Sequence, residues 1–117
     1  MWTAVALPLL VASATLTAAP SASAGSAACT HPSWVNKDSG SGYGQQLYER
    51  IRTGPSSDCP MTTWVPSSQR LYYHCFRTNS AGNNWTHVRV SGTEVNGWIW
   101  NGNLSDGGSF EHCAYSP

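Results

Sequence analysis

Charged side chains are scarce in this sequence of 117 residues. They make up 10% of the chain, with six Lys and Arg against six Asp and Glu, whereas about 25% is usual for a soluble protein. A nucleic-acid-binding protein needs a basic patch, and a membrane-surface protein needs a polybasic segment. The sequence has neither charge pattern, so we expect no nucleic-acid partner.

Long hydrophobic runs are also missing. The main apolar stretch lies near the N-terminus, around residues 5–11, and thins out by residue 19, whereas a bilayer span needs roughly 20 residues. The sequence Ala22-Ser23-Ala24 then has the small-x-small form of a signal-peptidase site, although no Lys or Arg precedes the apolar stretch. We therefore interpret residues 1–24 as a cleaved signal peptide, and we expect a secreted, extracellular protein without membrane insertion.

Motifs for catalysis and for cofactor binding are not found in the sequence. It contains no Gly-x-Ser-x-Gly, no phosphate-binding loop and no dinucleotide fingerprint, and its six carboxylates show no spacing that pairs them. The dipeptides His74-Cys75 and His112-Cys113 lack zinc-site spacing, and neighbours on a strand point to opposite faces. We predict a protein that is not an enzyme, without cofactor or metal.

Four cysteines stand in this short chain. An even number of cysteines in a small exported protein indicates disulfides, and four allow three pairings. We expect Cys29–Cys113, which would join the two ends, and Cys59–Cys75, which would join a turn to a strand. Each bridge would contribute roughly 2–4 kcal/mol to a domain whose core is small.

Proline and glycine interrupt nearly every segment after residue 44, and no stretch of ten residues has a helical period. Alternation predicts strands over residues 46–52, 71–78, 85–90 and 97–100, with a loop over 56–69 and a hairpin loop over 79–83. In the first strand Leu47 and Ile51 share one face, and in the second Leu71, Tyr73 and Cys75 do. The sequence predicts a small all-β barrel or sandwich. Residues 25–44 have no clear periodicity and include a Ser- and Gly-rich run, so we interpret them as a flexible N-terminal arm.

Four segments, in this order and spacing, carry a family resemblance: Ile51-Arg52-Thr53-Gly54-Pro55-Ser56-Ser57, Trp85-Thr86-His87-Val88-Arg89-Val90, Gly97-Trp98-Ile99 and Leu104. Together they resemble the bacterial Src-homology-3-like domain, and the run from Leu71 to Phe76 is similar to small exported actinobacterial proteins of this type. The resemblance implies that residues 45–117 form a small barrel of about five short strands. Its expected core residues are Leu71, Val88, Val90, Ile99 and Leu104. Glu49 departs from the pattern, because its alternation with Ile51 would favour an apolar side chain.

A small barrel fills its interior with side chains, so a ligand would bind at the surface. Domains of this family use aromatic side chains to line a groove, and the resemblance implies that the candidate ligand-binding residues are Tyr72, Phe76, Trp85, Trp98 and Trp100. For each of them, packing against the barrel is the alternative, and we expect it for Trp85. Trp34 and Tyr43 of the arm are expected to cover a barrel face.

The resemblance implies a monomeric binding domain at the bacterial cell envelope, with a cell-wall glycan or peptide as its ligand. Such domains usually accompany a catalytic domain, which this chain does not carry. The alternative is therefore an interaction or adaptor subunit of a secreted protein complex, such as a toxin or inhibitor system, that binds a secreted protein.

Overall fold

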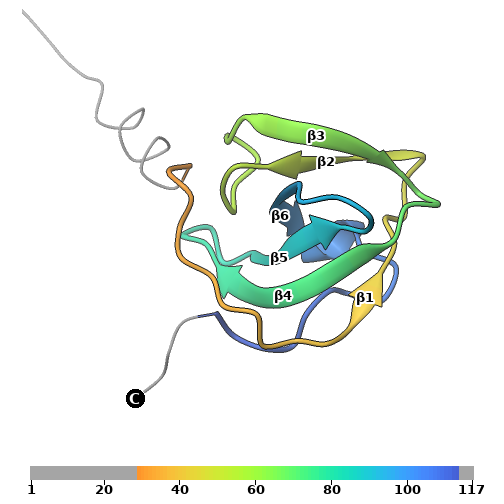
Figure 1. Ribbon diagram of the computed structural model, residues 1–117. Coiled ribbons are helices and arrows are strands. Elements are labelled where there is room, and N and C mark those ends of the chain that lie inside the picture. The colour runs from red at the N-terminus through yellow and green to blue at the C-terminus, as the bar shows by residue number, and fades with distance from the viewer. Residues whose placement is uncertain (1–28, 114–117) are drawn as a thin grey trace, which may run out of the picture.

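The computed structural model of the protein describes residues 29–113 and confirms the all-β class. One antiparallel sheet has the strand order β1-β4-β5-β6-β2-β3. Figure 1 shows it curled, with β2 and β3 on one side, β4 and the short β1 on the other, and β5 and β6 between. The elements are β1 (Ser41–Gly42), β2 (Tyr48–Arg52), β3 (Met61–Pro66), β4 (Leu71–Thr78), β5 (Asn84–Val90), β6 (Asn96–Trp100) and the 3₁₀ turn η1 (Asn101–Asn103).

The strand β3 lies where the sequence predicts a loop, so that prediction is wrong. Two prolines bound the strand, and Val65 is its one fully buried side chain, so the period-2 signal is missing. The expected face of the first strand is also wrong, because Leu47 precedes β2 and is exposed. Glu49 instead shares the inner face with Ile51, and its Oε2 accepts the backbone N–H of Gln46 at 3.0 Å.

The inner face of the curled sheet holds the main core. All five expected core residues lie in it, joined by Ile51, Val65 and Tyr73. Each fully buried aliphatic side chain contributes about 1.5–3 kcal/mol. The hydroxyl of Tyr73 donates to Asp106 Oδ1 at 2.5 Å, which provides the hydrogen bond that a buried phenol needs.

A second cluster lies on the outer face and consists of Cys75, Trp85, Trp98 and Cys113. Cys75 joins this cluster because the register of β4 shifts between Tyr73 and Cys75. Because one extra residue turns every later side chain to the other face, Cys75 leaves the face of Tyr73. The sequence prediction that Leu71, Tyr73 and Cys75 share one face is therefore wrong for Cys75.

The disulfides join Cys29 to Cys59 and Cys75 to Cys113, with Cα–Cα distances of 5.2 and 4.8 Å. The expected pairs Cys29–Cys113 and Cys59–Cys75 are wrong. The reason is the path of the C-terminal segment, which runs beside β4 rather than back to the N-terminus. Phe76 and His112 form a parallel bridge, and this pairing places Cys113 next to Cys75. Two disulfides in a small domain are consistent with an extracellular protein.

Residues 33–42 of the arm run along β4 (Figure 1), whereas Cys29 at its start is bonded to Cys59 in the loop between β2 and β3. The backbone N–H groups of Lys37 and Asp38 donate to the carbonyl of His74, and β1 then pairs with the start of β4. The expected signal peptide, residues 1–24, lies outside the described residues. Within residues 29–113 the structure contains no helix with the length and apolar character of a membrane span.

Candidate functional site

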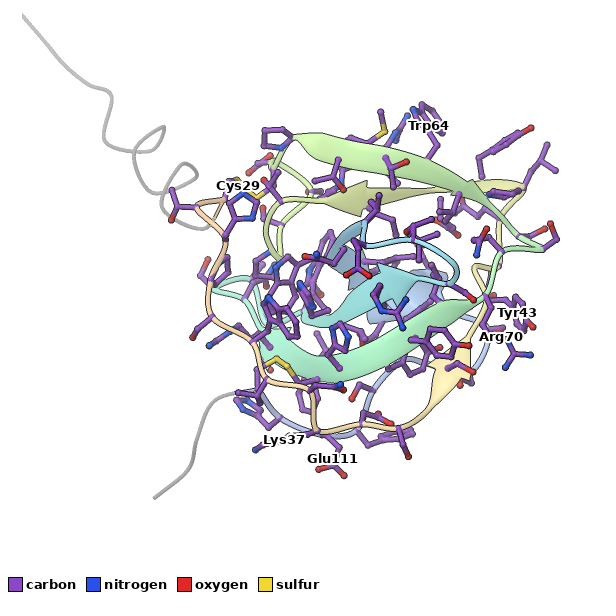
Figure 2. The ribbon with its side chains drawn as sticks, viewed as in Figure 1. Cys29, Lys37, Tyr43, Trp64, Arg70 and Glu111 are labelled. Atoms are coloured by element: carbon purple, nitrogen blue, oxygen red, sulfur yellow. A yellow bond between two sulfur atoms is a disulfide. The ribbon has the colours of Figure 1, made fainter. Side chains whose placement is uncertain are left out.

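A groove of about 450 Å³ lies on the outer face, on the side of the sheet that the arm leaves open. Residues of β2, β3, β5 and β6 line it, together with the loops next to them. Three of its aromatic side chains are half-exposed: Tyr48 at 54%, Trp64 at 51% and Trp100 at 41%. Figure 2 shows Trp64 projecting outward from β3. Half-exposed aromatic rings that lie together in a groove provide rigid contact area for a ligand.

The pairing of the strands brings these side chains together. Arg50 on β2 lies directly opposite Trp64 on β3, and Trp85 on β5 lies opposite Trp100 on β6. The two pairs are joined because β2 also pairs with β6, through Arg52 and Trp98. Neighbouring strands are about 4.8 Å apart. An aromatic row therefore crosses β3, β2, β6 and β5, with Arg50 between its indoles.

Arg50 and Tyr48 both contact Trp64. The Arg50 guanidinium carbon lies 5.1 Å from the centre of the Trp64 ring, within the range of a cation–π contact. The ring of Tyr48 meets the same indole edge-on, with the ring centres 6.2 Å apart. These contacts hold Trp64 at the rim of the groove although it is not packed in a core.

The charged side chains of the groove differ in whether they have hydrogen-bond partners within the protein. Arg52 donates through Nη1 to the carbonyl oxygen of Cys59 at 2.8 Å, so it supports the β2–β3 loop. Glu49 is 2% exposed, and it accepts the backbone N–H of Gln46. Among the described residues, Arg50 has no recorded partner other than Trp64. Within residues 29–113, its guanidinium is thus the groove cation whose N–H donors meet no protein acceptor.

Two of the five residues that the sequence singled out line this groove, namely Trp85 and Trp100. Trp85 is buried and forms part of the wall, as expected, whereas Trp100 presents its ring to solvent. Trp98 is 1% exposed and belongs to the outer cluster. Tyr72 and Phe76 lie on β4, outside the groove.

Sequence reasoning did not single out Tyr48, Trp64 or Arg50. The sequence predicts a loop over residues 56–69, so it gives no sign that Trp64 lies opposite β2. The signal that could have found it is the spacing of Tyr48, Arg50 and Arg52. In a strand these three residues share the face opposite Glu49 and Ile51.

A second cluster of titratable groups lies under the arm. The imidazoles of His74 and His87 are buried, and their Nδ1 atoms are 2.8 Å apart. The indole of Trp34 stacks on both rings at centroid distances of 4.4 and 4.2 Å. Trp98 packs edge-on against His87 at 4.9 Å. Trp34 thus covers a face of the sheet, as the sequence predicted.

Burial is the main cause of the altered pKa values of these histidines. Burial, and then the charge of Arg89, lowers the pKa of His74 below its ordinary value. Burial, followed by the influence of His74, lowers the pKa of His87 to about 3. Both imidazoles are therefore neutral at pH 7, with one Nδ1 donating to the other. Within residues 29–113 no three side chains of metal-ligating type come together.

Comparisons of the chain with family models, with curated proteins and with solved structures find no match.

Proposed function

We propose that the protein is a small, exported, non-enzymatic binding domain that acts at the bacterial cell envelope, and that its aromatic groove binds a cell-wall component. The observation that carries the proposal is the row formed by Trp64, Arg50 and Trp100 beside Tyr48. Three large rings, those of Tyr48, Trp64 and Trp100, remain half-exposed there.

The chemistry of the groove suits a ligand with flat apolar faces and polar edges. Indole and phenol rings supply apolar contact together with N–H and O–H groups. The side chains of Gln46, Asn83 and Asn103 add amide donors and acceptors around the rings. A sugar ring or a short peptide offers both kinds of surface, and both occur in cell walls.

The resemblance to the bacterial Src-homology-3-like domain supports the same proposal. Its signal segments include Ile51–Ser57, which contains the end of β2, and Gly97–Ile99 within β6. These are two of the strands that line the groove. The disulfides fit an exported protein, because such bridges persist in oxidising compartments.

Sedimentation with purified cell-wall sacculi tests the proposal. The oxidised protein is incubated with sacculi at low and at moderate salt, and the fraction in the pellet is measured as a function of protein concentration. We expect saturable binding that persists at moderate salt, because ring stacking depends little on ionic strength. Absence of binding would contradict the proposal and would favour a secreted protein as the partner, which a pull-down from culture medium would then identify.

A further inference from the structure

The guanidinium of Arg50 is the starting point of a further inference that rests on the proposed function. It is held over Trp64 at 5.1 Å and, within the described part of the chain, meets no carboxylate. A guanidinium carries five N–H donors in a planar fork, and it pairs best with a planar acceptor such as a carboxylate. A stacked arginine with all of its donors available is therefore a ready anion-binding group.

The charge of the groove fits a single anionic group. Arg50 and Arg52 are its cations, and Glu49 is its one acid. Arg52 is bonded to the Cys59 carbonyl, and Glu49 points to the opposite side of β2 from Arg50 by strand alternation. The formal charges of these three groove residues sum to +1, and Arg50 is the cation among them whose N–H donors remain available. A net charge of +1 suits the binding of one carboxylate. It does not suit a polyphosphate chain, because such a chain needs several cations in a row.

We propose that Arg50 is the specificity-determining residue of the groove, and that the groove selects the carboxylates of cell-wall peptides. In this arrangement the carboxylate accepts two N–H bonds from Arg50, while the neighbouring apolar part of the ligand lies against Trp64 and Trp100. The contact of Arg50 with Trp64 orients the fork before the ligand arrives, which lowers the entropy lost on binding. The same contact leaves the in-plane N–H groups free to donate.

Three preparations of sacculi test this assignment. The first keeps its covalently attached phosphate polymers, the second is stripped of them with hydrofluoric acid, and the third is stripped and then amidated at its carboxylates with carbodiimide and ammonium chloride. We expect equal binding to the first two preparations and at least tenfold weaker binding to the third, because a charge-assisted hydrogen bond to a carboxylate is lost. Undiminished binding to amidated sacculi would overturn the assignment to carboxylates while leaving the proposed function intact. Loss of binding on stripping would overturn it in favour of phosphate polymers.

The residue is tested by Arg50→Gln, with Arg89→Gln as the matched control. Arg89 lies over Tyr72 at 5.0 Å in a similar cation–π contact, but it is outside the groove. We expect Arg50→Gln to bind stripped sacculi at least tenfold more weakly and to lose the preference for unamidated material, whereas Arg89→Gln behaves as the wild type. Arg50→Lys keeps the charge but not the planar arrangement of N–H donors, and we expect an intermediate affinity.

Equal losses of affinity in Arg50→Gln and Arg89→Gln would overturn the assignment, since general charge would then explain the binding. Near-ultraviolet circular dichroism verifies that each variant is folded. If the wild type binds none of the three preparations, the proposed function itself has failed.

Discussion

The Nδ1 atoms of His74 and His87 meet at 2.8 Å beneath the indole of Trp34, which stacks on both rings. One of these nitrogens donates a proton and the other accepts it, so a further proton on the acceptor would bring two N–H groups face to face. The pair joins the neighbouring strands β4 and β5. The arm is attached at the same place, since the carbonyl of His74 also accepts its backbone N–H groups. Protonation of this pair therefore opposes the hydrogen bond that joins β4 to β5 beneath the arm.

Acid is expected to destabilise the fold through these two histidines. Their pKa values are lowered in the folded protein, to about 3 for His87, whereas an unfolded histidine has a pKa near 6.5. As the pH falls below about 6.5, the unfolded chain takes up protons that the folded protein does not bind, and for His87 this difference persists to about pH 3. The free energy of unfolding should thus fall across this window, by up to about 1.4 kcal/mol per pH unit for His87, and the lowered pKa of His74 acts in the same direction.

Urea unfolding at pH 7 and at pH 5 measures this effect. Arg89 and His31 act on the pair as neighbouring charges. The double variant His74→Asn/His87→Asn keeps these groups and serves as the control. A loss of stability between pH 7 and pH 5 that is as large in the double variant as in the wild type would contradict the role given to the histidines.

Trp34→Ala should loosen the arm without unfolding the domain. The indole of Trp34 is 40% exposed, so its removal forfeits the stacking on two imidazoles rather than a full core contact. We expect a loss of about 1–2 kcal/mol in the free energy of unfolding. Trp34→Phe, which retains a stacking ring, should lose less. An unchanged unfolding midpoint in Trp34→Ala would show that the stacking contributes nothing.

The disulfide pairing can be read from tryptic peptides under non-reducing conditions. Trypsin separates all four cysteines, because basic residues lie between them. We expect one linked pair that joins the peptide ending at Lys37 to residues 53–70, and a second that joins residues 71–77 to the C-terminal peptide from residue 90. A link between Cys29 and Cys113 would be incompatible with the path of the C-terminal segment along β4.

Removing either disulfide should cost the domain much of its stability. The bridges span sequence separations of 30 and 38 residues, and closing loops of this length stabilises a fold by about 3–4 kcal/mol in the chain-entropy model. Replacing both cysteines of one bridge by alanine should lower the free energy of unfolding by that amount, as measured by urea unfolding. Comparable losses are expected for the two bridges, since their loop lengths are similar.

Trp98 and Trp100 are two residues apart in β6, but their substitution should have opposite effects on stability and on ligand binding. Trp98 is 1% exposed in the outer cluster and packs against His87, so Trp98→Ala should cost about 3–5 kcal/mol. Trp100 is 41% exposed, so Trp100→Ala should change stability by less than about 1 kcal/mol while weakening ligand binding. Thermal unfolding distinguishes the two variants. Weaker binding by Trp98→Ala would therefore reflect a loss of folded protein. The contribution of the groove to binding is measured with Trp64→Ala and Trp100→Ala, because we expect these variants to stay folded.

The core could be predicted because strand alternation, the turns and the family resemblance indicate the same apolar residues. Leu71, Val88, Val90, Ile99 and Leu104 are apolar residues that the resemblance places in the barrel core, between Gly- and Pro-rich turns, and all five are buried together. The disulfide pairing could not be predicted in this way. It depends on the register shift in β4 and on the course of the chain after η1, and neither leaves a periodic trace in the sequence.

The sequence indicates only part of the groove, because one of the strands that line it lacks a periodic pattern. Trp85 and Trp100 stood in recognisable strands, whereas Trp64 stood between prolines in a strand with a single buried side chain. Trp98 and Trp100 are alike in the sequence. They differ in burial, because His87 and the outer cluster enclose Trp98 and leave Trp100 exposed to solvent.

The most direct measurement follows the indole N–H signals by nuclear magnetic resonance during titration with soluble fragments of enzymatically digested cell wall. Each tryptophan gives its own signal, and single substitutions assign the signals to residues. If the groove binds the cell wall, the signals of Trp64 and Trp100 shift in a saturable manner, while those of Trp34 and Trp98 stay in place. Shifts confined to Trp34, or no shift of any indole at high fragment concentration, would contradict the account.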